Sequence, residues 1–501
     1  MKIVPLSYKE AARGKNIFLP LFQKEPLEKE ELFSYLPALN KNAVKELYKK
    51  EFKGEEGETK SVWFPQGAIS RVRLFGWGEK KRWNYRKNPL VARRYVQYAK
   101  SERVTEFATP FGKALGMGKK EAASLFAANA VMAEFDFNKY KEKPESGWPE
   151  VKTIYLAAHI SDLTELKAGI AEGIIIGEEV NHCRELANTP GGEMTPARLA
   201  EAAAKAAKTN GIRAKILDEK EMKRLGMGGV LGVAKGSSEK PQFIIMEYSA
   251  GRQKPLVLVG KGVTFDTGGL NVKPDQYMLD MHMDMSGGAA VIHGMAAIAR
   301  LKLPVNVVGI VPAVENMPSG TSYRPGDLLK TMSGKTIEVL NTDAEGRVIL
   351  SDALYYGATK YKPGLMVDFA TLTGAAHVAL GNYVSAVFSN RDNLLEKFEE
   401  IGKRSGDYVW RLPLWDEYLT EIKGVFGDVA NASRGERFGG AIQGAKFLEQ
   451  FVNGAAWAHL DISPRMTSVD TDLLTKGATG VGVRYIIELA KCYPEILNSK
   501  S

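Results

Sequence analysis

Two short, almost entirely apolar runs separated by a helical stretch constrain the fold more than any other feature of this sequence. Residues 255–260 read PLVLVG and residues 305–311 read VNVVGIV, with a helical pattern over residues 288–301 between them. A strand that is apolar on both faces has to be covered on both faces, which is typical of a parallel sheet with flanking helices. The pattern therefore predicts an α/β fold built on a mixed, mostly parallel sheet.

The same alternation continues on both sides of these runs. At 501 residues the chain is too long for one ordinary core, so we expect two α/β domains. Residues 1–162 read as an irregular N-terminal α/β domain, residues 163–190 as a connecting helix, and residues 191–501 as the main domain. Within the main domain, strands are expected at residues 214–217, 229–233, 243–248, 336–340 and 365–370, and helices at residues 196–208, 220–225 and 347–360.

Composition excludes several classes of protein. Hydrophobic residues make up 44% and charged residues 25%, and no apolar run approaches the roughly 18 to 20 residues that span a bilayer. The first residues lack the apolar stretch and cleavage site of a secretory signal. Only Cys183 and Cys492 are present, which favours a reducing compartment. We therefore expect a cytoplasmic protein that does not enter a membrane.

The positive charge is concentrated in one region. The formal net charge is +9, and residues 61–120 alone carry fourteen Lys and Arg against three Glu, a net +11. Aromatic residues stand among them, including Trp63, Phe64, Phe75, Trp77, Trp83, Tyr85, Tyr95 and Tyr98. Charge mixed with flat rings is a feature of nucleic-acid surfaces. The favoured interpretation is a solvated basic face whose aromatic side chains point into a local core, with nucleic-acid binding as the alternative.

Charged residues gather in three segments that border predicted strands and helices: residues 260–273, 281–288 and 341–347. Ligands bind open α/β sheets at the carboxyl ends of strands, so these segments form the candidate site. They supply four carboxylates, two lysines and one arginine: Asp266, Asp284, Asp343, Glu345, Lys261, Lys273 and Arg347. Four acids in one apolar cleft would repel one another unless cations neutralise them, and oxygen-rich clusters suit divalent metals. No H-E-x-x-H motif or G-x-S-x-G elbow competes with this interpretation.

At these residues the sequence closely resembles the leucyl aminopeptidase family of dinuclear metallopeptidases. The family signature NTDAEGR stands at residues 341–347, and VGKGVTFDTGG at residues 259–269 and ENMPSG at residues 315–320 are further family blocks. The likeness covers about residues 165–490, whereas the first 160 residues resemble the family's N-terminal domain loosely. The resemblance implies that residues 191–501 are a catalytic metallopeptidase domain and that residues 1–162 support oligomerisation.

The resemblance also assigns roles to individual residues. The family's metal ligands fall on Lys261, Asp266, Asp284, Asp343 and Glu345. These residues would hold two divalent ions per subunit, Zn²⁺ or Mn²⁺, with Asp266 and Glu345 as the bridging pair. The catalytic side chains correspond to Lys273, which would stabilise the developing oxyanion, and Arg347, which would hold a bicarbonate ion. The side-chain pocket corresponds to Met281, Thr371, Gly374 and Met466.

The activity implied by this resemblance is a metal-dependent aminopeptidase that hydrolyses the N-terminal bond of peptides by a hydroxide bound to both metals. Leucine-like or other apolar N-terminal residues would be preferred, and the family forms homohexamers. One alternative is a dipeptidase in the same fold, for example one that cleaves cysteinylglycine, because Ser463-Pro464 stands where other members have smaller residues. Another is an aminopeptidase that also binds nucleic acid through residues 61–120.

Overall fold

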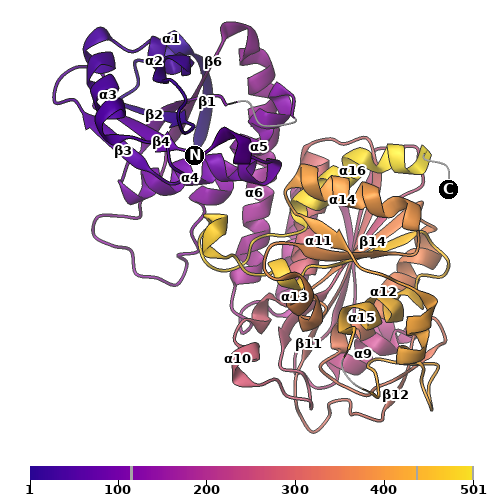
Figure 1. Cartoon of the computed structure of the whole chain (residues 1–501). Helices are drawn as coiled ribbons and strands as arrows, with labels where there is room; N and C mark the ends of the chain where they lie inside the picture. The colour runs from indigo at the N-terminus through magenta and orange to yellow at the C-terminus, as the bar shows by residue number, and fades with distance from the viewer. Residues whose placement is uncertain (113–116, 436–437, 499–501) are drawn as a thin grey trace. The chain divides into compact units, whose positions relative to one another are not determined.

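The chain divides into two compact units, each with its own sheet and core. A computed structural model describes residues 1–112, 117–435 and 438–498 (Figure 1). The first unit comprises Met1–Glu178 with Asp470–Thr475, and the second comprises Glu179–Val469 with Lys476–Ser501. Within the described ranges, no helix is both long enough and apolar enough to cross a membrane. Both units combine sheets with flanking helices, so the predicted α/β fold class is confirmed.

The first unit is built on a six-stranded sheet in the order β1-β6-β5-β2-β4-β3. All neighbours in this sheet are parallel except β3 and β4, which are antiparallel. The strands are β1 (Lys2–Ser7), β2 (Asn16–Leu21), β3 (Thr59–Trp63), β4 (Arg71–Gly76), β5 (Glu106–Pro110) and β6 (Thr153–Ala158). The helices of this unit include α1 (Tyr8–Ala11), α2 (Glu31–Ser34), α3 (Ala38–Glu51), α4 (Asn88–Ser101) and α5 (Lys119–Glu134).

Helix α6 (Leu163–Asn188) packs closely on α5 along its first half. A Cβ atom at Gly169 or Gly173 would collide with a backbone oxygen of α5, and one at Gly177 would lie 2.6 Å from the Cβ of Val131. The glycines recur every four residues, so they line one side of the helix. Their missing side chains allow the two backbones to approach each other, and Leu166 and Ile170 join the core of the first unit.

The aromatic residues of the basic region mostly belong to this core. Phe75, Trp77 and Tyr95 are at most 4% exposed and pack together around Phe18. Trp63 is exposed, but the Arg71 guanidinium lies 4.2 Å from its ring centre. The region therefore uses its rings mainly for packing, as the favoured interpretation expected, while lysines such as Lys80, Lys81 and Lys87 pair with acids.

The second unit is built on a larger mixed sheet in the order β16-β15-β18-β14-β9-β11-β8-β7, with β10 beside the far half of β11. Strands β18, β14, β9 and β11 run parallel at its centre, while β7, β8 and β15 are antiparallel to a neighbour. The strands are β7 (Arg213–Leu217), β8 (Gln242–Ser249), β9 (Leu256–Gly260), β10 (Gly262–Asp266), β11 (Asn306–Asn316), β14 (Leu365–Ala370), β15 (Ser385–Ser389), β16 (Val409–Arg411) and β18 (Trp457–Asp461).

Helices cover both faces of this sheet. Helices α11 (Ser286–Arg300), α14 (Leu395–Ser405) and α16 (Val483–Asn498) lie together on one face, and α9 (Gly228–Ala234), α12 (Glu345–Tyr361) and α15 (Gly440–Glu449) lie on the other (Figure 1). Every residue of β9 and β14 is buried, as the apolar runs predicted. The remaining elements include α7 (Pro196–Thr209), α8 (Glu219–Leu225), α10 (Asp275–Met278), α13 (Gly374–Leu380), β12 (Leu328–Lys330), β13 (Thr336–Glu338) and β17 (Val429–Ala430).

One predicted strand is wrong. Residues 229–233 form helix α9 instead of a strand. A short, wholly apolar run fits either structure, because periodicity cannot separate a buried helical turn from a buried strand. The choice is made by Asp352, whose carboxylate accepts a hydrogen bond of 3.0 Å from the Val230 N–H at the start of the helix. Asp352 is 122 residues beyond Val230 in the sequence, so no local pattern could reveal this contact.

We expect Gly173→Ala to destabilise the first unit by about 1–3 kcal/mol, because the new methyl group would have no space between α5 and α6. In an uncrowded helix the same change would stabilise by about 1 kcal/mol, so the sign of the effect is diagnostic. Urea unfolding followed by circular dichroism measures it. Gly192→Ala, in a turn of the second unit where nothing lies within 4 Å of the added atom, is the control for an unhindered change of glycine to alanine. A Gly173→Ala protein as stable as the parent would contradict the close packing.

Candidate metal centre

Lys261 stands at the break between β9 and β10 and points into the interior of the second unit. Its backbone N–H donates to the Phe369 oxygen at 3.0 Å, and its backbone oxygen accepts from the Gly288 N–H at 2.7 Å. A Cβ at Gly287 would collide with the Phe369 oxygen, so a glycine is needed where α11 approaches β14. This close backbone approach holds Lys261 in a position where its side chain is only 3% exposed.

The Lys261 ammonium group joins two acids from distant segments. Its Nζ lies 2.7 Å from Asp284 Oδ2 and 2.7 Å from Glu345 Oε1, and it donates to the Thr371 backbone oxygen at 2.9 Å. The Thr371 hydroxyl donates to Asp284 Oδ1 at 2.6 Å. Asp284 precedes α11 and Glu345 begins α12, so the carboxyl end of the central sheet brings the two helix starts together.

Lys273 joins the other two acids. Its Nζ lies 2.8 Å from Asp266 Oδ2 and 2.5 Å from Asp343 Oδ1. The remaining oxygen of Asp266 accepts hydrogen bonds of 2.8 Å from Asn316 Nδ2 and from the Gly268 N–H. The structure therefore gathers all five residues predicted as metal ligands, together with the predicted catalytic Lys273, into one cluster.

Burial and mutual repulsion perturb the acids strongly. Burial, reinforced by the Glu345 charge, raises the pKa of Asp266 to about 6. Burial also raises the pKa of Asp284 well above its usual range and raises that of Asp343. Burial opposes ionisation of Glu345 as well, but Lys261 and Lys273 outweigh it and lower the pKa of that carboxyl. The cluster therefore depends on positive charge to stay ionised.

The donor set fits divalent cations. Asp266, Asp343 and Glu345 each offer an oxygen, and these atoms lie within 4.8 Å of one another. Asp284 Oδ2, Asp343 Oδ1 and Glu345 Oε1 are buried, and each forms an ion pair of 2.5–2.7 Å with Lys261 or Lys273. Four carboxylates that share two ammonium groups leave negative charge unbalanced, so this oxygen-rich cluster fits divalent cations. Lys261 would join them as a neutral amine, because a nearby dication expels its proton.

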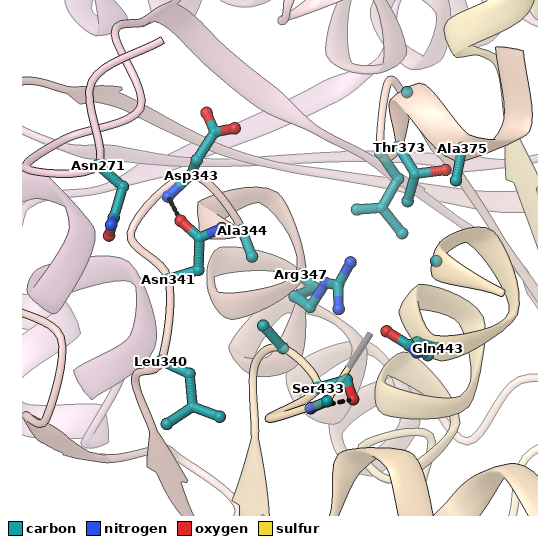
Figure 2. A pocket seen from close by; sticks show the side chains of 15 residues that line it. Asn271, Leu340, Asn341, Asp343, Ala344, Arg347, Thr373, Ala375, Ser433 and Gln443 are labelled. Atoms are coloured by element: carbon teal, nitrogen blue, oxygen red, sulfur yellow. Dashed lines mark hydrogen bonds between the residues drawn. The ribbon is translucent and has the colours of Figure 1, made fainter. Parts of the chain in front are cut away.

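A cavity of about 460 Å³ opens beside Asp343. Figure 2 shows Arg347 reaching from α12 into this cavity, with Thr373 and Gln443 on its far side. Arg347 Nη1 donates to the Asn431 backbone oxygen at 2.8 Å, while its Nε has no hydrogen-bond partner among the described residues. Burial lowers the pKa of Arg347 to about 10, which still leaves the guanidinium charged at neutral pH. The cavity thus presents a fixed positive charge.

The residues predicted to form the substrate pocket fall at different places. Gly374 lines the cavity, and Thr371 lies beneath Asp284 rather than at the cavity wall. Met281 begins the short 3-10 helix that precedes Asp284, and Met466 follows another 3-10 helix at residues 463–465. Both methionines are half-buried, and neither is among the described residues that line this cavity. Their role in the pocket stays a prediction.

Ser463, where the sequence departs from the family pattern, has a structural partner. Its hydroxyl donates to Asp461 Oδ1 at 2.6 Å and accepts from the Thr373 N–H at 3.2 Å. Thr373 in turn caps α13, whose first residue is Gly374. Ser463 therefore helps to position one wall of the cavity.

Sequence reasoning missed three residues that shape the site: Asn316, Thr342 and Asn431. Asn316 holds Asp266, Asn431 accepts from Arg347, and the Thr342 hydroxyl donates to the Gly268 oxygen. Asn316 and Thr342 lie inside family blocks, which was the available signal. Asn431 comes from a segment with no motif, and only the structure brings it to the site.

A second group of possible metal ligands lies between α6 and α11. Glu179 Oε2 is 2.8 Å from His293 Nδ1 and 3.5 Å from His182 Nδ1. However, Arg300 Nη1 lies 2.6 Å from the other Glu179 oxygen, so this carboxylate already has a cation. We interpret the group as an ion-pair network that joins two helices.

Comparisons with known proteins point in one direction. A family model described as the catalytic domain of the cytosol aminopeptidase family matches residues 181–487, and a model of that family's N-terminal domain matches residues 18–144. The chain is 42% identical to a probable cytosol aminopeptidase of Chlorobaculum tepidum over 88% of this chain and 90% of that protein. It is 43% identical to one of Geobacter sulfurreducens over 79% of this chain and 80% of that protein. A similar solved structure is the bottromycin maturation enzyme BotP in complex with Mn, with a TM-score of 0.83, 28% identity and coverage of 96% and 99%.

Metal analysis tests the centre directly. We expect the purified protein to retain about two equivalents of Zn²⁺ or Mn²⁺ after dialysis, and Asp266→Asn to lose most of both because this acid adjoins the other ligands. Inductively coupled plasma mass spectrometry gives the count. Asp275→Asn, which changes an exposed acid of α10, is the matched control. Equal metal content in the two variants would contradict the assignment.

Proposed function

The chain belongs to the cytosol aminopeptidase family, and on that premise we propose that it is a two-metal aminopeptidase that releases apolar N-terminal residues from peptides. The observation that carries the proposal is the convergence of four carboxylates and Lys261 in one buried cluster, beside a cavity lined by Arg347. Hydrolase activity of the aminopeptidase class follows from the family. The metals, the mechanism and the substrate preference are proposals.

We propose the ligands of the two cations as the family resemblance implies them. Lys261, Asp266, Asp284 and Glu345 would hold one ion, and Asp266, Asp343 and Glu345 the other, with Asp266 and Glu345 shared. The side chains of Asp266, Asp284 and Glu345 are at most 4% exposed, while that of Asp343 is 34% exposed, so the second ion would exchange more readily. When bound, such cations polarise a peptide carbonyl and supply hydroxide from water at neutral pH.

Lys273 is suited to stabilise negative charge on the substrate. Burial acts against its ammonium form, but Asp266, Glu345 and Asp343 outweigh burial and raise its pKa. It therefore keeps its proton near neutral pH, and its side chain remains 15% exposed. A fixed ammonium group can donate a hydrogen bond to the oxygen on which charge develops during attack, where such donors have their largest effect.

Arg347 is suited to bind a small anion. Its guanidinium lines the cavity, and its Nε has no protein partner among the described residues. Gly444 permits this position, since a Cβ there would lie 3.3 Å from Arg347 Nη2. We propose bicarbonate as the anion, which would serve as a proton carrier between water and the leaving amine. Such an anion would explain why no histidine or free carboxylate is needed as a base.

The substrate preference is proposed from the predicted pocket of Met281, Thr371, Gly374 and Met466. Two methionines provide an adaptable apolar wall, which suits leucine- or methionine-sized side chains. The runner-up is a dipeptidase in the same fold. The Ser463 hydroxyl forms hydrogen bonds with Asp461 and Thr373 and so helps to position α13. This structural role of Ser463 does not favour the dipeptidase.

The cellular setting and partners are proposals of the same kind. Cys183 and Cys492 are both buried and unpaired, which supports a reducing compartment such as the cytoplasm. Peptides are the proposed substrates. Nucleic-acid binding is not favoured, because Phe75, Trp77 and Tyr95 of the basic region pack in the core instead of facing solvent.

We expect Lys273→Met to lower kcat for a leucyl anilide by about 10²–10³-fold, because the variant cannot donate to the oxyanion. A chelator should abolish the parent's activity, and added Zn²⁺ or Mn²⁺ should restore it. Lys330→Met, the same change at an exposed site, is the control. Release of leucine that survives exhaustive chelation would overturn the two-metal proposal. Cleavage of dipeptides without cleavage of longer peptides would favour the dipeptidase.

We also propose that the protein is a homohexamer, as the family resemblance implies. Six copies of the 55.0 kDa chain have a mass of about 330 kDa, and closed symmetric assemblies are the usual form of soluble oligomers. Light scattering coupled to size exclusion at micromolar concentration measures this mass. A value of 55.0 kDa would show a monomer and contradict the proposal.

A further inference from the structure

The first unit contains a cavity of about 430 Å³ that the metal centre does not use. It lies where three parallel strands end: Pro20 and Phe22 belong to the end of β2, Trp77 follows β4, and Pro110 with Phe111 ends β5. Helices α4 and α5 close it with residues such as Val91 and Phe126. Its size falls within the range of small-molecule sites. We call it the β2–β5 cavity.

The connections of the sheet place this cavity at a topological switch point. Strands β2 and β5 are neighbours, paired at Ile17 and Ala108. From β2 the chain moves to β3 and β4 on one side, whereas from β5 it moves to β6 on the other side. At such a point the two connections diverge and leave a crevice outside the carboxyl ends of the strands, which is where open α/β sheets bind ligands.

Six aromatic side chains line this cavity. The six rings are Phe22, Trp77, Trp83, Tyr95, Phe111 and Phe126. Trp83 meets Phe22 and Trp77 edge to face, with ring centres 5.3 Å and 5.4 Å apart. The electron-rich faces of such rings attract cations. The Arg94 guanidinium carbon lies 4.5 Å from the centre of the Trp77 ring, and Lys80 Nζ lies 5.5 Å from the centre of the Phe22 ring. A flat ring or an organic cation would find complementary surfaces here.

One polar group among these walls lacks a cationic partner. Glu30 lines the cavity and accepts from the Leu32 N–H at 3.1 Å. Over the described ranges no lysine or arginine forms an ion pair with Glu30, and burial raises its pKa to about 7. The Tyr95 residue is 1% exposed, and its hydroxyl interacts with Thr109 and Trp77. A ligand that donates a hydrogen bond would therefore find its partner in Glu30.

We propose that the β2–β5 cavity binds a small aromatic amine, with its ring between the aromatic side chains and its nitrogen donating to Glu30. The assignment follows from the combination of aromatic rings in the walls and a half-buried carboxylate, Glu30, without a cationic partner among the described residues. None of the residues of this cavity belongs to the metal centre. The site is therefore independent of the proposed peptidase activity.

Calorimetric titration of the full-length protein with tryptamine tests the proposal. We expect saturable binding of tryptamine. Indole-3-propionate, which has the same ring but the opposite charge, should bind at least tenfold more weakly. Butylamine, which has the amine but no ring, should also bind at least tenfold more weakly. Glu30→Gln should weaken tryptamine binding at least tenfold, while the glutamine keeps a side-chain oxygen that can accept the hydrogen bond from Leu32 at the start of α2. Glu28→Gln, an exposed change on the preceding turn, is the matched control. Val91→Trp, which fills the cavity, should abolish binding.

An amine could also bind at the metal centre, so the titration is repeated in the Asp266→Asn background. Binding that is retained there but lost in Val91→Trp supports the β2–β5 cavity. Binding that is lost with Asp266→Asn and kept with Val91→Trp overturns it, as does equal affinity for indole-3-propionate. Leucyl anilide hydrolysis by Glu30→Gln should match the parent, and an unchanged urea unfolding curve shows that the first unit of this variant is folded. Failure of the tryptamine titration would leave the aminopeptidase proposal untouched.

Discussion

The second unit is organised around four carboxylates that meet in one cluster, three of them where water hardly reaches. Asp266, Asp284 and Glu345 are each at most 3% exposed, and such acids repel one another strongly at short range. Positive charge keeps them ionised, and Lys261 and Lys273 supply it from within the chain. Divalent cations would supply it more effectively, because each carries twice the charge of an ammonium group. This requirement explains why the cluster contains lysine.

The surrounding fold makes the cluster possible by fixing its backbone. The break between β9 and β10 is locked by hydrogen bonds of Lys261 to Phe369 and Gly288. Gly287 and Gly346 admit close approach, since a Cβ at Gly346 would lie 2.6 Å from Lys261 Cε. Neutral side chains then orient the acids, with Asn316 on Asp266 and Thr371 on Asp284. A charged cluster of this density needs rigid neighbours, because small displacements change its electrostatic energy steeply.

Both units use the carboxyl edge of a parallel sheet, but with opposite chemistry. In the second unit the strand ends carry acids and lysines, and the neighbouring cavity presents Arg347. In the first unit the corresponding edge carries aromatic rings with Glu30 among them. The shared position follows from geometry, since parallel strands leave their ends exposed between diverging connections. The residues at those ends, not the fold, decide what each edge can bind.

The sequence by itself determined the fold class, most strands of the second sheet and the identity of the charged residues. Apolar runs such as residues 255–260 are buried on both faces, and this constraint is visible locally. The tertiary structure alone decided that residues 229–233 form a helix, because the deciding partner, Asp352, is 122 positions away. It also brought Asn431 to Arg347 and placed Glu30 beside Tyr95 in a ring-lined cavity. Such contacts join segments with no common pattern, so they exist only once the sheets have formed.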